Sequence, residues 1–230
     1  MKSFIIYVKG HLKSEEYAQA CLSSMQKGFD VELFEGATAD SFDYWENYFK
    51  FPEINNARLL AFKKENLYRY QTKKSCVFNH ARLWEKCIEI DEPICFIEQD
   101  SHCVRAWDNV DFDEVLILNA ESALLKRGDI GVNPLELRMY CANMDKGVND
   151  WSEAPTRYHR NNLMLGHAHN PGNGAYCFTP KAAKKLLQAA RNGVDQGDMF
   201  INTSVVKMQY VMPEYFTFKL PNLGMSHGFK

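Results

Sequence analysis

The amino-terminal part of the chain alternates apolar runs with a segment of helical spacing. FIIYV (4–8) is a β-branched and aromatic run that predicts a strand. SEEYAQACLSSMQ (14–26) has apolar residues near helical spacing and Ser14 as a candidate N-cap, and VELFEG (31–36) predicts a second strand. A strand, a helix and a strand in this order are typical of a parallel βαβ unit.

Ligands of such units bind beyond the carboxyl ends of the strands. The residues at these positions are expected to lie near a bound nucleotide: Lys9, Gly10, Glu35 and Gly36. No GxGxxG motif follows the first strand, which disfavours an ordinary dinucleotide-dependent dehydrogenase.

The middle of the chain predicts one clear helix and two buried strands. In SCVFNHARLWEKCIEI (75–90) the apolar residues and His80 fall on one stripe, opposite the charged residues. PICFI (93–97) is apolar at every position, which predicts a central strand covered on both faces, and EVLILN (114–119) has the same character. Residues 37–73 are aromatic-rich without a clear period, and we expect an irregular segment packed over a site.

The second half of the chain is less regular. A polar stretch from 120 to 171 contains a helical pattern at 134–146 and a loop of Asn, His and Gly residues, which we expect to be flexible and to line the acceptor side. That loop carries His167 and His169, and Arg157, His159 and Arg160 are assigned to it as well. GAYCFT (174–179) predicts a strand, and PKAAKKLLQAARNG (180–193) predicts a helix with Pro180 at its first position and Gly193 past its end. From Ser204 on, short apolar pieces alternate with prolines.

Composition indicates one packed domain of 230 residues, with 46% apolar and 24% charged residues. A net charge of −2 excludes a protein that wraps nucleic acid with its whole surface and leaves only a local basic patch. The seven cysteines form no CxxC pair, which is typical of reduced thiols in a cytosolic protein. The first apolar run has five residues, and no run approaches the ~20 of a membrane span, so we expect a cytoplasmic protein without membrane insertion.

The stretch ICFIEQDSHC (94–103) ends an apolar strand on two carboxylates. Alternate strand positions share a face, so Glu98 and Asp100 are expected to converge outside the sheet. Two such oxygen donors, together with a substrate diphosphate, suit Mg²⁺ or Mn²⁺. The alternative is a pair of solvated or lysine-paired acids at the sheet edge. His102 would share their face if the strand continued, and otherwise is a loop histidine at the rim.

Four segments in order resemble glycosyltransferase family 25, the lipooligosaccharide-type galactosyltransferases and their phage-encoded relatives: SCVFNHARLW, FIEQD, GAYCFTPKAAKKLL and GVDQGD. The matching residues are Cys76, His80, Leu83, Trp84, Glu98, Asp100, Ala175, Tyr176, Pro180, Lys181, Ala183, Lys184, Lys185, Leu186, Leu187, Val194 and Asp195. The chain departs from the family pattern at Ser75, where Gly is usual, at Asn79, where Ser is usual, and at Gln99, which replaces the middle acid of EDD.

The resemblance implies an α/β fold of GT-A (Rossmann-like) type, with a mostly parallel sheet flanked by helices in a single domain, residues 1–230. A donor-nucleotide half would span about 1–119 and an acceptor and catalytic half about 120–230. The implied donor is a nucleotide-sugar, with uridine diphosphate the family's usual carrier, and the implied cofactor is a divalent metal ion, Mn²⁺ or Mg²⁺. The expected metal ligands are Glu98, Asp100 and the late histidine His227, for which an exposed tail histidine without a role is the alternative.

Other residues receive roles from the same resemblance. Asn79, His80 and Gln99 join the residues expected around the donor, and His80 also fits a buried histidine that supports the site. An inverting transfer needs a carboxylate to take the proton of the acceptor hydroxyl. Asp195 and Asp198 are the candidate bases, with donor-sugar binding or helix capping near Met199 as alternatives.

The acceptor stays open between two classes. KKENLYRYQTKK (63–74) interleaves five basic residues with two tyrosines, which suits phosphate neutralisation and base stacking as well as a solvated helix face. Phage-encoded relatives suggest hydroxymethylated pyrimidines in DNA as acceptor, held slightly ahead of a cell-surface saccharide. A third hypothesis is a non-catalytic binding protein whose EQD segment holds no metal.

Overall fold

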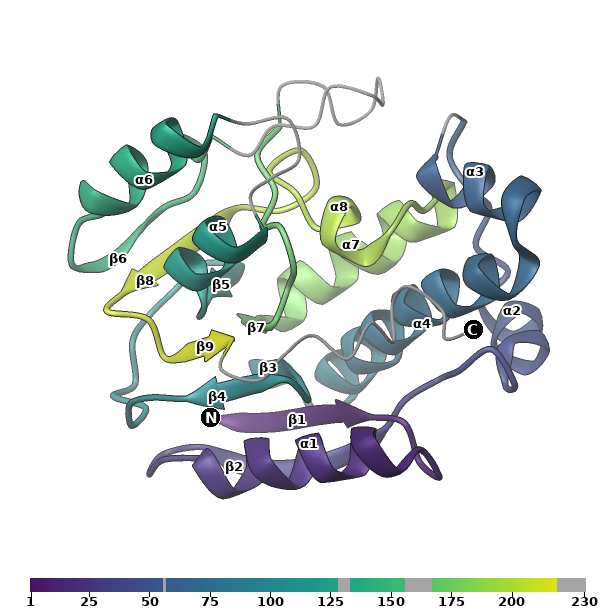
Figure 1. Ribbon diagram of the computed structural model, residues 1–230, viewed down its shortest axis with the longest axis horizontal. Coiled ribbons are helices and arrows are strands. Elements are labelled where there is room, and N and C mark those ends of the chain that lie inside the picture. The colour runs from purple at the N-terminus through teal and green to yellow at the C-terminus, as the bar shows by residue number, and fades with distance from the viewer. Residues whose placement is uncertain (56, 128–132, 156–166, 219–230) are drawn as a thin grey trace.

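A seven-stranded sheet runs through the part of the chain that this computed structural model describes, which comprises residues 1–55, 57–127, 133–155 and 167–218 (Figure 1). Its strand order is β2-β1-β3-β7-β5-β8-β6. The strands are β1 (Lys2–Tyr7), β2 (Asp30–Glu35), β3 (Ile94–Glu98), β5 (Val115–Ile117), β6 (Gly147–Asp150), β7 (Ala175–Phe178) and β8 (Met208–Met212). A two-stranded sheet joins β4 (Ser101–Cys103) to β9 (Phe216–Phe218).

Most strands of the large sheet point in one direction. β1 pairs in parallel with β2 and β3, and β5 pairs in parallel with β8, whereas β7 is antiparallel to both β3 and β5. β6, at the edge, is antiparallel to β8. The fold class predicted from the sequence, an α/β domain with a mostly parallel sheet flanked by helices, is confirmed.

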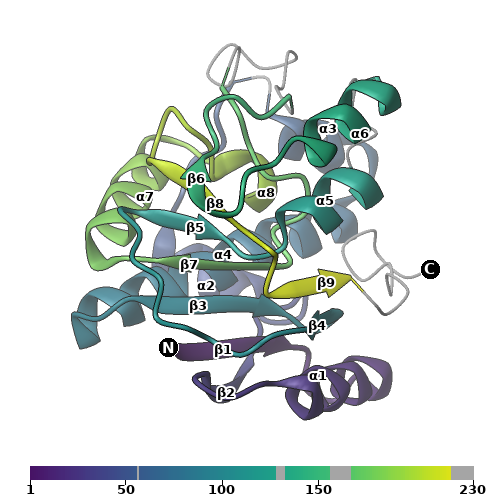
Figure 2. The same cartoon turned by 90° about the vertical axis from the view of Figure 1, so that its left-hand side faces the viewer.

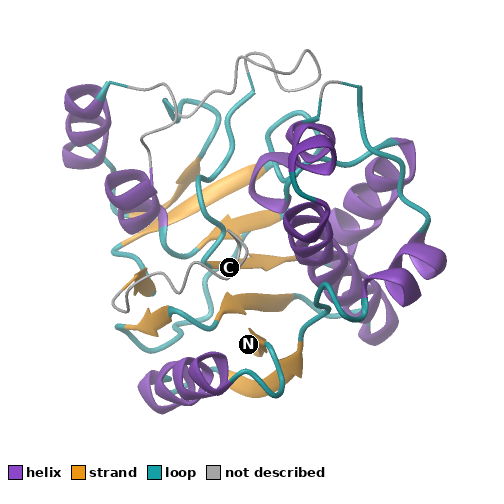
Figure 3. Ribbon diagram, turned by 45° about the vertical axis from the view of Figure 1, so that its right-hand side comes forward, coloured by secondary structure: helices purple, strands orange, loops and turns teal. Residues whose placement is uncertain are grey.

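Helices lie on both sides of the sheet (Figure 3). They are α1 (Leu12–Ser24), α2 (Phe42–Phe49), α3 (Arg58–Glu65), α4 (Leu67–Ile90), α5 (Ala120–Arg127), α6 (Pro134–Ala142), α7 (Pro180–Asn192) and α8 (Gly197–Phe200). None of the helices in the described part of the chain is long and apolar enough to cross a membrane.

Alternate residues of the strands pack into two separate hydrophobic cores, one on each face of the sheet. Phe4 and Phe96 pack with α4 and α7 on one face, whereas Ile5 and Ile97 pack with α1 and β9 on the other. This double coverage explains why β3 is apolar throughout, and Figure 2 shows β3 near the middle of the sheet.

The segment expected to be irregular, 37–73, is largely helical and contains α2, α3 and the first two turns of α4. The helix predicted from residue 75 begins at Leu67, because Asn66 caps it: Asn66 Oδ1 accepts a hydrogen bond of 2.9 Å from Arg69 N. The first helix is capped by His11 rather than Ser14. Ser14 is buried inside the first turn and has a different role.

The second half of the chain also differs from expectation. The loop predicted to be flexible is buried from Ala168 to Gly174 and is fixed by a bridge between His169 and Asn202. Residues 168–174 are therefore packed inside the protein instead of forming an exposed, flexible loop. His167 is half-buried, and Arg157, His159 and Arg160 lie outside the described residues.

Candidate active site

A cavity of about 400 Å³ opens at the carboxyl ends of β1 and β3, between α4 and the loop after β2. Seven of the residues selected from the sequence line this one cavity: Lys9, Gly10, Asn79, His80, Glu98, Gln99 and Asp100. Glu35 and Gly36 do not line it, although the next residue, Ala37, does. The topology therefore brings the donor and metal candidates together at one edge of the sheet.

The turn after β1 is held by the first turn of α1. Gly10 adopts a left-handed conformation with φ of 79°, and its N–H donates to Glu15 Oε1 at 2.8 Å. Val8 N donates to Ser14 Oγ at 2.7 Å, and the Ser14 hydroxyl in turn bonds to Gln99 Oε1. Ser14 thus ties the turn after β1 to the turn after β3, and this role explains its burial.

Lys9 and Glu35 form an ion pair of 3.4 Å across the ends of β1 and β2. Both side chains are more than half exposed, so the pair contributes little to stability. Glu35 is exposed and does not line the cavity, which is lined instead by the loop beyond it, from Ala37 to Asp40.

The Glu98–Asp100 segment is a turn rather than a continued strand. β3 ends at Glu98, residues 99–100 form the turn, and β4 begins at Ser101. One carbonyl fixes both sides of the turn, because Gly174 O accepts from Glu98 N at 2.7 Å and from Ser101 Oγ at 2.8 Å. Glu98 and Asp100 are therefore not on one face of a continuous strand, as the sequence pattern predicted, but both of them line the cavity.

This pair of carboxylates fits a divalent cation in its donor chemistry. Asp100 is 7% exposed and Glu98 is half-buried, so both present hard oxygen atoms to a sheltered space that a diphosphate could share. Among the residues that the structure describes, no group of three His, Cys, Asp or Glu side chains is arranged to hold a metal ion. The third expected ligand, His227, lies outside the described residues.

His80 is fixed at the cavity floor by aromatic neighbours. Its ring stacks on Phe96 with centroids 4.2 Å apart, and its Nδ1 lies 2.9 Å from Tyr176 Oη. Tyr176 Oη also accepts from Trp84 Nε1 at 3.3 Å, and burial raises the pKa of Tyr176, so the hydroxyl keeps its proton. That proton is available to His80 Nδ1, which favours the tautomer with the hydrogen on Nε2.

The segment after α7 reaches the cavity floor at Gly197. A Cβ there would lie 2.7 Å from His80 Nε2, so only glycine permits this approach. Two residues earlier, Asp195 is fully buried, and its carboxylate accepts from Arg58 N and Leu59 N at 3.3 Å each and from Gln196 N at 2.8 Å. Asp195 thus caps α3, not the helix near Met199, and it does not line the cavity.

Asp198, the other candidate base, lies in the first turn of α8, next to Gly197. His102 is in β4 opposite Thr217 and outside the cavity lining.

The basic aromatic segment 63–74 is divided between the protein interior and the surface. Lys74 is fully buried, with its Nζ 2.8 Å from Glu46 Oε1 and 2.9 Å from Glu53 Oε1. Burial acts to raise the pKa of Glu53, but hydrogen bonds from Tyr70 and Lys74 outweigh it and lower that pKa. Lys63 remains exposed, with its Nζ 5.0 Å from the centre of the Tyr70 ring. The segment is therefore not a continuous phosphate-binding face.

Sequence reasoning missed part of the cavity wall. Tyr68, Thr72, Cys76 and His80 follow one another at intervals of four along α4 and all line the cavity. Asp40, from the loop after β2, lines it as well. The four-residue spacing indicates one helix face, but the sequence pattern predicts the helix only from residue 75, so Tyr68 and Thr72 fall outside the predicted helix.

Comparison with known proteins identifies the family of the chain. The family model described as Glycosyltransferase family 25 (LPS biosynthesis protein) matches residues 1–201. The chain belongs to glycosyltransferase family 25, and it is a glycosyltransferase. No curated protein matches it. Among solved structures, the chain is similar to the crystal structure of mouse xyloside xylosyltransferase 1 in its apo form, with 10% identity, a TM-score of 0.35, and coverage of 87% of this chain and 80% of that chain.

Proposed function

We propose that this glycosyltransferase moves a sugar from a nucleotide-sugar, with uridine diphosphate as carrier, to an acceptor hydroxyl, with inversion and with the help of Mn²⁺ or Mg²⁺. The observation that carries the proposal is the shared cavity: Glu98 and Asp100 face the same space as the turn after β1 and the loop after β2. Within the part of the chain that the structure describes, its lining comes from residues 6–100, which supports a donor-binding half in residues 1–119.

Charge in the cavity supports metal dependence. Among the described residues, the lining contains three carboxylates, from Asp40, Glu98 and Asp100, and one lysine, Lys9. A diphosphate in this space is repelled unless a cation lies between it and the carboxylates. Glu98 and Asp100 would hold this cation, and the chemistry that it supplies when bound is neutralisation of charge on the leaving nucleotide diphosphate.

We assign the proton transfer to the segment after α7. The contacts of Asp195 support a capping role, and this leaves Asp198 as the favoured base for the acceptor hydroxyl. His80, held by Tyr176 and Phe96, supports the cavity floor without taking part in the proton transfer.

For the acceptor we now favour a saccharide. Part of the basic segment that suggested DNA does not face a ligand, because Lys74 is bound by two glutamates and Tyr70 is buried. The family model's description as an LPS biosynthesis protein supports a glycan acceptor. The seven free cysteines support a cytoplasmic location.

The test compares wild type with Asp100→Asn in the presence of Mn²⁺ and a panel of nucleotide-sugars. We expect one donor to raise the melting temperature of the wild type by mass action, and the variant to lose this gain while its own melting temperature stays near the wild-type value. Asp91→Asn, an exposed change at the end of α4, is the matched control.

Transfer to a lipooligosaccharide core and to hydroxymethylcytosine oligonucleotides then separates the acceptors. Transfer to the oligonucleotides alone would reverse our choice of acceptor. A wild type that binds no nucleotide-sugar, or an Asp100→Asn variant that behaves like the wild type, would favour the non-catalytic binding protein.

A further inference from the structure

The cavity wall contributed by α4 is long and has two chemically different ends. Tyr68 and His80 are twelve residues apart on the same face, which corresponds to about 18 Å along the helix axis. His80 stacks on Phe96, two residues before Glu98, so this end of the wall is next to the carboxylates. An elongated ligand that has one end at the carboxylates would therefore have its other end beside Tyr68.

Tyr68 presents an aromatic ring at that end. It is 50% exposed, whereas Tyr70, two residues further along α4, is 2% exposed and bonds to Glu53. An exposed aromatic ring that lines a cavity offers a stacking surface to a base, because every base has an aromatic face.

Asp40 presents a carboxylate at the cavity wall. It is exposed, and within the described part of the chain it has no ion pair or side-chain hydrogen bond. The loop that carries it is tied to α4 because Ser75 Oγ donates to Thr38 O at 3.0 Å and Asn79 bonds to Ala37. Asp40 is therefore a hydrogen-bond acceptor on a loop that is fixed in position, and it can accept hydrogen bonds from a ligand.

We propose that Tyr68 and Asp40 form the nucleoside end of the donor site, with Tyr68 stacking on the base and Asp40 accepting hydrogen bonds from the ribose hydroxyls. The assignment rests on the proposed function and adds the orientation of the donor. An acidic residue just beyond the second strand of a βαβ unit is placed to bind a ribose. Asp40 fits this position because it lines the cavity, whereas Glu35 is paired with Lys9 and does not line it.

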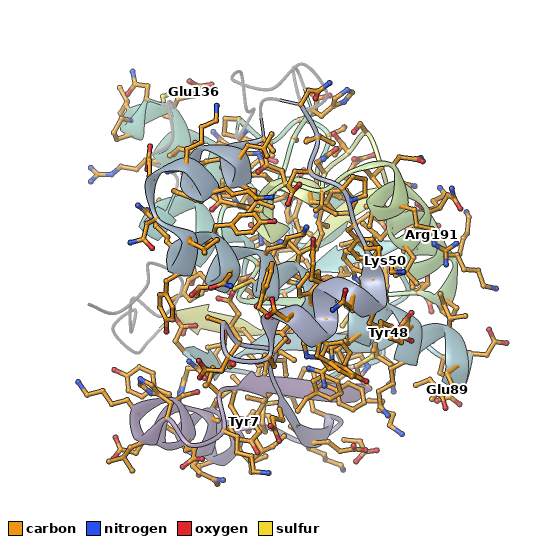
Figure 4. All side chains as sticks on the ribbon, turned by 90° about the vertical axis from the view of Figure 1, so that its right-hand side faces the viewer. Tyr7, Tyr48, Lys50, Glu89, Glu136 and Arg191 are labelled. Carbon is orange, nitrogen blue, oxygen red and sulfur yellow. The ribbon has the colours of Figure 1, made fainter. Side chains whose placement is uncertain are left out.

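The test measures dissociation constants by calorimetry, with Mn²⁺ present, for UDP, 2′-deoxy-UDP and inorganic pyrophosphate. If the donor panel selects another base, its diphosphate replaces UDP. The variants are Tyr68→Ala, Tyr68→Phe and Asp40→Asn. The controls are Tyr48→Ala and Asp43→Asn, exposed residues of α2 outside the cavity, and Figure 4 shows Tyr48 on the outer surface.

We expect Tyr68→Ala to weaken UDP binding about tenfold and Tyr68→Phe to leave it unchanged, because stacking needs the ring and not the hydroxyl. Wild type should bind 2′-deoxy-UDP about fivefold more weakly than UDP, and Asp40→Asn should bind both at the weaker level. Pyrophosphate binding and the control variants should match the wild type.

Several results would overturn the assignment. Equal losses for UDP and pyrophosphate in Tyr68→Ala would make Tyr68 a general structural support. If Asp40→Asn still binds 2′-deoxy-UDP more weakly than UDP by the wild-type factor, Asp40 does not bind the ribose. If the Tyr68 and Asp40 variants bind UDP like the wild type but have a raised KM for the acceptor, this end of the cavity binds the acceptor. A wild type that binds no nucleotide at all would instead reject the proposed function itself.

Discussion

The carboxamide of Asn79 bonds to both backbone polar groups of Ala37. Asn79 Oδ1 accepts from Ala37 N at 2.5 Å, and Asn79 Nδ2 donates to Ala37 O at 3.3 Å. Arg82 Nη1 strengthens the arrangement by donating to Glu35 O at 2.8 Å. A side chain on α4 thus holds the chain where it leaves β2, at the position where the family pattern usually has serine.

Replacing Asn79 by serine should weaken nucleotide binding and stability together. Serine cannot reach both groups of Ala37, and two buried backbone groups left without partners cost about 2 kcal/mol of unfolding free energy, or about 6 °C in melting temperature. The loop 37–40 would lose its position, so we expect the dissociation constant for UDP to rise about fivefold, as measured well below the melting transition.

Asn79→Ala provides the comparison, because it removes both hydrogen bonds to Ala37 and adds no charge to the cavity. It should lose at least as much UDP affinity as Asn79→Ser. Asn192→Ser, at the exposed end of α7, is the control. A lower melting temperature with unchanged UDP affinity in both Asn79 variants would show that the clamp serves stability alone.

Asp195 and Asp198 should separate into a structural and a catalytic residue. Asp195→Ala removes a carboxylate from three backbone amides, and we expect a loss of about 2 kcal/mol in unfolding free energy. Asp198→Asn should lower kcat by at least about 100-fold, since it removes a general base, with the melting temperature and donor affinity unchanged.

Single-turnover kinetics and thermal unfolding of both variants, together with Asp195→Asn, decide between the two residues. Asp195→Asn keeps the size of the side chain, so a normal melting temperature with a large loss of kcat would return the base role to Asp195. A fully active Asp198→Asn enzyme would exclude Asp198.

Much of the fold could be predicted from the sequence, because the strongest patterns of strands and helices depend on residues that are close together in the chain. The apolar run of β3 and the helix α7, with Pro180 at its first position and Gly193 at its C-cap, lie close to the predicted limits. The cavity was predictable in outline, since residues that follow β1 and β3 meet at the edge of a parallel sheet.

The remaining features depend on contacts between distant parts of the chain. Lys74 looks like a solvated residue in sequence, and only Glu46 and Glu53 explain its burial. In the same way, β7 enters the sheet between β3 and β5 in the opposite direction, and β4 pairs with β9 from the far end of the chain. No local pattern carries this information.

Glu114 should make the stability of the protein depend on acidic pH. Burial raises its pKa, but hydrogen bonds from Lys185 Nζ at 2.6 Å and Lys207 N at 2.9 Å, and an ion pair with Lys181, outweigh it and lower the pKa from 4.5 to about 2. A depressed pKa adds stability that is complete above the unfolded value and is lost as the pH falls from about 4.5 toward 2.

Glu114→Gln removes this contribution, which amounts to up to about 3 kcal/mol at neutral pH. In urea unfolding, the difference between wild type and Glu114→Gln should be largest at pH 7 and should shrink steadily below about pH 4.5. Glu32→Gln is the control, because Glu32 is exposed and its ion pair with Lys2 is 3.9 Å long, so its effect should be near zero at every pH. A Glu114→Gln difference that stays constant between pH 7 and pH 3 would mean that the three lysine contacts do not stabilise the ionised carboxylate.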